Sequence, residues 1–115
     1  EAKEQFMLES LFGTVNRERV LLYLYAREEG YAREMSRFYE VALGTMQNQL
    51  EKLEAGGVLY SRSAGTTHLD ALNPRYAFRE ELSALLEKVL SLYPEEERKR
   101  LTGGRRRPRR KGKPL

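Results

Sequence analysis

The sequence predicts a mainly α-helical fold in which two helices joined by a short turn precede a small β-hairpin, with further helices on both sides. Three observations lead to this prediction. Apolar residues recur at helical spacing in two successive runs between Tyr31 and Leu53, which is typical of a pair of amphipathic helices. Gly56 and Gly57 end the second run, and two β-rich runs flank Gly65 directly afterwards.

Length and composition narrow the class of protein. The 115 residues can form one domain with a single core. Because the chain has no cysteine, disulfides and thiolate metal sites are excluded, and a reducing cytoplasm fits this composition. No apolar run approaches the roughly 20 residues of a membrane span and no signal-peptide pattern opens the chain, so we expect a cytoplasmic protein with no membrane segment.

The first two predicted elements are helices. Residues 1–12 are expected to form a helix that packs on its own domain or on a second subunit, through Phe6, Met7, Leu8, Leu11 and Phe12. Gly13 is expected to end this first helix. Thr14, a favoured N-cap residue, then begins a helix over residues 15–28. The apolar residues of this second helix point inward, and we interpret it as scaffold.

The central pair of helices begins with a short helix that has a basic outer side. Tyr31, Met35 and Phe38 fall on one face of it, which leaves Arg33 and Arg37 together on another face. A turn at residues 39–41 follows. The two arginines are therefore expected to face solvent or a negatively charged partner.

The second helix of the pair, residues 43–55, has one buried stripe and one polar face. Leu43, Met46, Leu50 and Leu53 repeat at spacings of 3, 4 and 3, as the residues of a buried stripe do. The opposite side and its flanks carry mainly short or amide-bearing residues, which are Gly44, Thr45, Gln47, Asn48, Glu51, Lys52 and Ala55.

This polar face suits the major groove of DNA, which admits a helix and where Asn and Gln pair with adenine. Gln47 and Asn48 are the candidate base-reading residues. The candidates that place the helix on the DNA are Arg33, Arg37, Gly44, Thr45 and Lys52. The alternative is that Gln47, Asn48 and Gln49 form an ordinary solvated surface.

A β-hairpin is predicted after the glycine pair. Residues 58–63 and 67–72 are rich in residues that favour strands, and Ala64, Gly65 and Thr66 form a tight turn between them. A hairpin that directly follows two such helices is typical of a winged helix-turn-helix, in which it forms the wing.

Residues 33–74, REMSRFYEVALGTMQNQLEKLEAGGVLYSRSAGTTHLDALNP, resemble the winged helix-turn-helix of ArsR-like bacterial transcription regulators. With its lead-in the resemblance covers residues 11–74, and LEKLEAGGVL, residues 50–59, is its most specific part. Two positions depart from the family pattern, because Ala42 replaces a serine-type cap and Glu40 replaces a common turn glycine. The strand over residues 67–71 is also less aromatic and less basic than is usual in the family. The resemblance implies a DNA-binding domain over residues 13–74.

In winged helices the hairpin lies along the DNA backbone or in the minor groove, so the resemblance implies DNA contacts by Arg62, Thr66, Thr67 and His68. His68 is the only histidine in the chain. It has no acidic or histidine partner at ligand spacing in the sequence, so we predict no metal site. No pattern of nucleophile, base and orienting acid is present either, and we predict neither an enzyme nor a cofactor.

The next predicted helix has a wider apolar side than one small domain needs. Asn73 and Pro74 are expected to cap it, and residues 78–93 carry apolar residues at heptad spacing. We infer that this side pairs with a second copy of the chain, through Phe78, Leu82, Leu85, Leu86, Val89, Leu92 and Tyr93. The alternative is that it packs entirely against residues 15–28. A two-fold dimer would read half-sites about 34 Å apart on DNA.

A last short helix begins at Pro94, so residues 75–102 hold two helices ahead of a basic tail. Residues 103–115 have nothing to bury and are expected to be disordered. Seven of the 21 basic residues lie in this tail, which leaves 14 basic and 17 acidic residues, a net charge of −3, in residues 1–102. The tail is expected to bind phosphates without specificity through Arg105, Arg106, Arg107, Arg109 and Arg110.

The combined expectation is a homodimeric, sequence-specific regulator of bacterial transcription whose partner is double-stranded DNA. The alternative is a protein-interaction module with the same fold, whose basic tail binds nucleic acid without specificity. The weak cap at Ala42, the acidic Glu51 on the polar face and the net charge of −3 favour this alternative. The sequence carries no signature of an effector.

Overall fold

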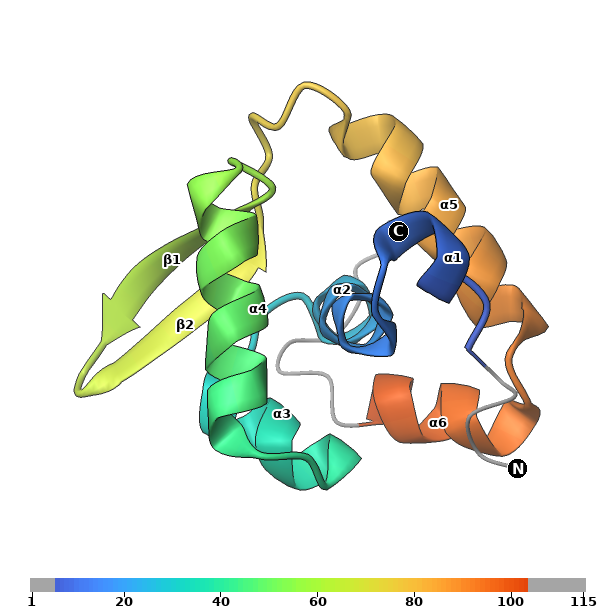
Figure 1. Ribbon diagram of the computed structural model, residues 1–115, viewed down its shortest axis with the longest axis horizontal. Coiled ribbons are helices and arrows are strands. Elements are labelled where there is room, and N and C mark those ends of the chain that lie inside the picture. The colour runs from blue at the N-terminus through green and yellow to red at the C-terminus, as the bar shows by residue number, and fades with distance from the viewer. Residues whose placement is uncertain (1–5, 104–115) are drawn as a thin grey trace, which may run out of the picture.

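The structure, a computed structural model, describes residues 6–103 and has the mainly α, winged helix-turn-helix fold that the sequence predicts (Figure 1). The fold-class prediction is therefore confirmed. The elements in chain order are α1 (Glu9–Phe12), α2 (Val15–Arg27), α3 (Ala32–Tyr39), α4 (Leu43–Ala55), β1 (Leu59–Ala64), β2 (Thr67–Leu72), α5 (Arg79–Leu92) and α6 (Glu95–Gly103). The start of the predicted N-terminal helix and the basic tail from residue 104 onward lie outside the described residues.

Helix α2 is the centre of the core. In Figure 1 it is seen end-on in the middle of the molecule, with α4 and the hairpin on one side, α5 on the other and α6 below. It contacts all five other helices and β2. Residues 20–24 are almost completely inaccessible to solvent, which is expected where neighbours cover a helix on all sides.

Both positions that depart from the ArsR-like pattern lie in the turn between α3 and α4. Glu40 has φ 57° and ψ 48°, the left-handed conformation that favours glycine, and Ala42 gives α4 no side-chain cap. The hydroxyl group of Ser36 instead donates a hydrogen bond of 2.6 Å to the carbonyl oxygen of Val41. The turn is therefore held by a side chain of α3 rather than by a capping residue of α4.

The hairpin forms as predicted, with Leu59 opposite Leu72 and Ala64 opposite Thr67. Gly65 has a φ of 66°, the left-handed conformation that a tight two-residue hairpin turn needs at its first position. The segment before α3 joins the sheet, because the backbone N–H of Gly30 donates to the carbonyl oxygen of Asp70, and the carbonyl oxygen of Gly30 accepts from the backbone N–H of Asp70. The wing is thereby attached to the end of α2.

The helix predicted over residues 1–12 is shorter than expected, since only Glu9–Phe12 is helical in its described part. The backbone N–H groups of Met7 and Leu8 donate to the buried carboxylate of Glu18 instead of to a helix. Donors that bond a distant side chain cannot also close a helical turn. The prediction of a helix through residues 6–8 is therefore wrong.

The start of α5 also differs from the prediction. The side-chain oxygen of Asn73 accepts a hydrogen bond of 3.0 Å from the backbone N–H of Arg75, which makes a turn at Pro74 rather than a helix start. Helix α5 begins only at Arg79. The prediction that Asn73 and Pro74 cap this helix is therefore wrong.

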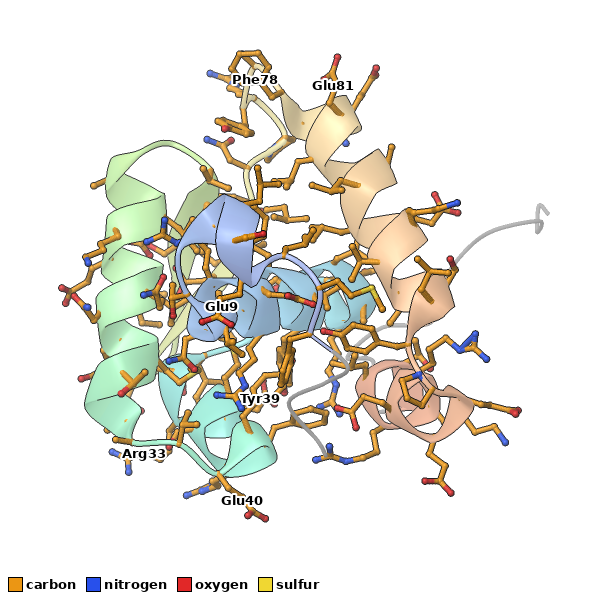
Figure 2. All side chains as sticks on the ribbon, turned by 45° about the vertical axis from the view of Figure 1, so that its right-hand side comes forward. Glu9, Arg33, Tyr39, Glu40, Phe78 and Glu81 are labelled. Carbon is orange, nitrogen blue, oxygen red and sulfur yellow. The ribbon has the colours of Figure 1, made fainter. Side chains whose placement is uncertain are left out.

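The apolar residues of α5 divide into an inner and an outer group. Leu86, Val89 and Tyr93 are buried in the core of the domain itself, so their predicted pairing with a second copy is wrong. Leu82 and Leu85 are half-buried against the same core. Phe78 and Leu92 lie at the two ends of the helix and are 62% and 58% exposed, and Figure 2 shows Phe78 at the tip of the molecule.

Candidate nucleic-acid interface

A groove of about 790 Å³ lies between α4 and the wing, with the start of α3 at one end. Five of the residues predicted to contact DNA line it, namely Arg33, Gln47, Thr66, Thr67 and His68. The sequence analysis placed these residues on three separate elements. The fold brings them to one side of the molecule.

The outer face of α4 carries the two amides predicted to read bases. Gln47 and Asn48 are both exposed, as are Gly44 and Lys52, whereas Thr45 is half-buried. A polar, accessible face of this kind on the second helix of the pair is the surface that enters the major groove in helix-turn-helix proteins.

The third amide of this helix has a different role. Gln49 is buried, and its side-chain oxygen accepts a hydrogen bond of 2.9 Å from Nε of Arg17 on α2. The bond ties α4 to the central helix. The three adjacent amides are therefore not one solvated surface, because only Gln47 and Asn48 are exposed.

Arg33 and Arg37 are exposed on α3, next to the start of α4 in the fold. Figure 2 shows Arg33 at the outer edge of the domain, where α3 and α4 meet. Arg33 also lines the groove together with Gln47, so its side chain lies near the exposed face of α4. This position suits contacts with phosphates on either side of a groove.

The wing supplies fewer free cations than the sequence suggests. Nη2 of Arg62 lies 2.9 Å from Oε1 of Glu29, so its charge is balanced within the domain. Thr66 is exposed at the turn, and Thr67 is half-buried. The guanidinium group of Arg62 is paired but remains exposed, with 47% of its side chain accessible, so the wing offers both this group and the hydroxyl group of Thr66 to solvent.

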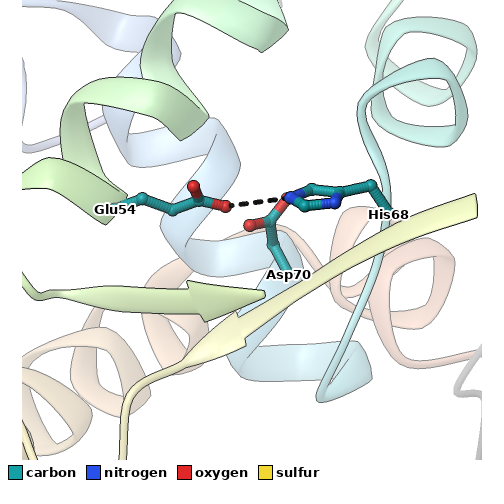
Figure 3. A group of neighbouring side chains, drawn as sticks. All are labelled: Glu54, His68 and Asp70. Carbon is teal, nitrogen blue, oxygen red and sulfur yellow. Dashed lines mark ion pairs between the residues drawn. The ribbon is translucent and has the colours of Figure 1, made fainter. Parts of the chain in front are cut away.

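Two acidic side chains, those of Glu54 and Asp70, lie next to His68 on the side of the wing that faces the groove. Nε2 of His68 lies 3.7 Å from Oε2 of Glu54, and the carboxyl group of Asp70 lies beside both (Figure 3). Burial raises the pKa of Asp70 to about 8, and a hydrogen bond with Glu54 and the charge of Glu54 act in the same direction. The prediction that His68 lacks acidic partners is therefore wrong.

Sequence reasoning missed Glu54 and Asp70 because it considered each element separately. Asp70 and His68 are two residues apart on a strand, and alternation along the strand places them on one face. The spacing of two residues between His68 and Asp70 was therefore the feature of the sequence that indicated their proximity. The approach of Glu54 depends on how α4 packs on the wing, which the sequence does not specify directly.

Comparisons of the chain with models of known protein families, with curated protein sequences and with solved structures gave no match. Among residues 6–103, no helix is both long enough and apolar enough to cross a membrane. The predicted contacts by Arg105, Arg106, Arg107, Arg109 and Arg110 fall outside the described residues.

Proposed function

We propose that this protein is a sequence-specific DNA-binding transcription regulator that inserts α4 into the major groove and lays its wing along the DNA backbone. The exposed amides of Gln47 and Asn48 would contact base edges, and Arg33, Arg37 and Lys52 would contact phosphates. The resemblance of residues 11–74 to ArsR-like regulators supports this function. The same resemblance and the absence of cysteine support a place in the bacterial cytoplasm.

Gly44 carries the strongest single argument for this proposal. It lies in the first turn of α4, and a Cβ atom built on it meets no atom within 4 Å. Its backbone has no positive φ either, so nothing in the described fold requires glycine. Glycine costs a helix about 0.5 to 1 kcal/mol relative to alanine. A close approach by an external partner, such as a DNA backbone, gives a physical reason for this residue.

Gly44→Ala is therefore expected to have opposite effects on stability and on binding. The free energy of unfolding should rise by about 0.5 kcal/mol, because alanine is the better helix former. Affinity for DNA should fall by about three- to tenfold, on the order of 1 kcal/mol, because the new methyl group occupies the contact surface. Urea unfolding and fluorescence anisotropy with labelled duplexes measure the two effects.

Gly103→Ala is the matched control for Gly44→Ala. Gly103 ends α6, and a Cβ atom on it also meets nothing within 4 Å. DNA affinity should not change in this variant. If Gly44→Ala also leaves DNA affinity unchanged, the first turn of α4 is not at the DNA surface.

We also propose that the regulator is a homodimer whose subunits meet along the outer edge of α5. Phe78, Leu85 and Leu92 are spaced by seven residues, about two helical turns, and therefore form one row along the helix. The two ends of this row are largely exposed. Burying such a row against its own copy would remove its apolar surface from water.

Leu92→Glu is expected to convert the dimer into a monomer of 13.4 kDa, because it places a charge in the apolar row. The molar mass from light scattering after size-exclusion chromatography measures this change. Glu87→Lys is the control, because Glu87 is exposed on the same helix on the side away from the row. A wild-type chain that is already monomeric at tens of micromolar would contradict the proposal.

A protein-interaction module is the second candidate function. The observation that favours it is the acidic lining of the groove, where Glu51 and Glu54 stand beside the amide of Gln47. Negatively charged carboxylates in this groove would repel the phosphate groups of DNA. Under this alternative the folded domain binds no DNA, and the basic tail binds all duplexes alike with a strong dependence on salt. A chain that ends at Gly103 separates the two candidates, because it retains DNA binding only if the folded domain contributes.

A further inference from the structure

We propose that Glu54, His68 and Asp70 together bind one divalent first-row transition-metal ion, for which Zn²⁺ is the probe, and that this ion fastens the wing to the last turn of α4. One potential ligand atom from each residue lies within 4.8 Å of the other two. Two of the ligands come from one face of β2 and the third from the helix opposite (Figure 3). The site does not depend on the proposed DNA-binding function.

Asp70 is the observation that points to a ligand. The residue is only 2% exposed, and its Oδ1 atom has no hydrogen-bond donor among the residues that the structure describes. Buried polar atoms in proteins nearly always have a partner, because they otherwise lose the hydrogen bonds that water would give. A cation held between Asp70 and Glu54 would supply that partner and would offset the repulsion of two neighbouring carboxylates.

The types of ligand select the class of metal. An imidazole nitrogen with two carboxylate oxygens suits Zn²⁺ and its neighbours in the first transition row. Ca²⁺ takes six to eight oxygen ligands, and Mg²⁺ prefers oxygen ligands in octahedral geometry. Three side chains that include a histidine do not meet either requirement. Mg²⁺ is therefore expected not to compete at this site.

The site is open to solvent on the side of His68, whose side chain is 66% exposed. Glu54, His68 and Asp70 all line the groove between α4 and the wing, which gives an ion a route of entry. Three protein ligands leave one position of a tetrahedral Zn²⁺ ion for water. Nε2 of His68 already points toward Glu54, so small side-chain rotations would bring it to the ion.

A bound ion would cross-link α4 to β2, which are joined in sequence by β1 and the hairpin turn. A metal clip that closes such a loop stabilises the folded state, because it limits the freedom of the unfolded chain and binds only the assembled ligands. Zn²⁺ is thus expected to raise the Tm of the protein and to fix the position of the wing relative to α4.

The test uses the untagged full chain, in which His68 is the only histidine. Its ring signals in a ¹H–¹³C NMR spectrum are therefore assigned without further work. Titration with Zn²⁺ should shift these signals and saturate at one ion per chain, while Mg²⁺ should leave them unchanged. Calorimetry gives the Kd, and thermal unfolding gives the expected rise in Tm.

Asp70→Asn and Glu51→Gln are the matched pair of variants. Asp70→Asn keeps the shape of a ligand and should weaken Zn²⁺ binding by more than about 100-fold, the upper end of the effect of removing an outer-shell partner. Glu51→Gln removes a carboxylate that lines the same groove outside the cluster, and it should bind Zn²⁺ like the wild type. The proposal is overturned if Zn²⁺ leaves the His68 ring signals unshifted, or if Asp70→Asn binds Zn²⁺ as tightly as Glu51→Gln.

Discussion

Glu18→Ala is expected to lower the free energy of unfolding by about 3 kcal/mol or more, because hydrogen bonds to a charged group contribute about 1.5 to 3 kcal/mol each. The carboxylate of Glu18 is completely buried on α2. It accepts hydrogen bonds from the backbone N–H groups of Met7 and Leu8, the latter at 2.8 Å, and from the hydroxyl group of Tyr93 at 2.6 Å. One side chain thereby holds the N-terminal segment and the end of α5 to the central helix.

A loss of about 3 kcal/mol should appear as a fall in Tm of roughly 12 to 24 °C, at about 4 to 8 °C for each kcal/mol in a domain of this size. Burial, and then the hydrogen bond to Glu18, raises the pKa of Tyr93, so its hydroxyl group stays protonated and remains a donor. Tyr93→Phe removes only that donor and should cost about 1.5 to 3 kcal/mol, the contribution of one hydrogen bond to a charged group. A Glu18→Ala variant that unfolds within 2 °C of the wild type would show that this network does not hold the fold.

Gly30→Ala is expected to lower the free energy of unfolding by about 1 to 3 kcal/mol, because it overpacks the core. A Cβ atom on Gly30 would lie 2.8 Å from Cε1 of Tyr23. That ring has no room to move, because Tyr23 is completely buried and packs edge-on against Phe38, with 5.2 Å between the ring centroids. Its hydroxyl group also accepts a hydrogen bond of 2.9 Å from Nη1 of Arg27.

The same substitution at Gly44 is the internal control, since it adds a methyl group in open space and should stabilise the protein. Urea unfolding of the two variants should therefore give shifts of opposite sign. The main-chain hydrogen bonds between Gly30 and Asp70 attach the wing, so Gly30→Ala should also increase amide exchange in β2. Equal stability of Gly30→Ala and the wild type would contradict the packing described for Tyr23.

Local sequence patterns were sufficient to predict most of the elements. The spacing of Met46, Leu50 and Leu53 placed α4, and Gly65 placed the turn of the wing, because helix periodicity and turn chemistry are properties of short segments. The strands of the wing were predicted to within one residue. These features need no knowledge of distant parts of the chain.

The misplaced start of α5 has a local cause, the turn in which Asn73 bonds Arg75, whereas the two larger failures involve contacts between distant residues. Glu18 captures the N–H groups of Met7 and Leu8 and thereby stops the predicted N-terminal helix, although the apolar pattern there is helical. The wide apolar side of α5 was assigned to a dimer, but the domain itself covers Leu86 and Val89. Periodicity identifies a buried side but does not say which partner covers it.

The candidate site was predicted in part. The exposed position of Asn48 follows from its place opposite the buried stripe of α4. Gln47 and Gln49 lie at similar angles on the two flanks of this stripe, so the burial of Gln49 alone depends on its contact with Arg17. The pairing of Arg62 with Glu29 and the cluster around His68 depend instead on tertiary packing. Side chains that meet across elements are therefore the part of a site that one sequence leaves open.

Selection from a random pool of DNA duplexes tests the central claim most directly. The full chain is expected to enrich a palindromic sequence, because a two-fold dimer reads two equivalent half-sites. Asn48→Ala should then lose about 1 to 3 kcal/mol, roughly 5- to 150-fold in affinity, against the enriched duplex and almost nothing against random duplexes. If the wild type enriches no sequence, or if Asn48→Ala weakens enriched and random duplexes equally, α4 does not read DNA in this protein.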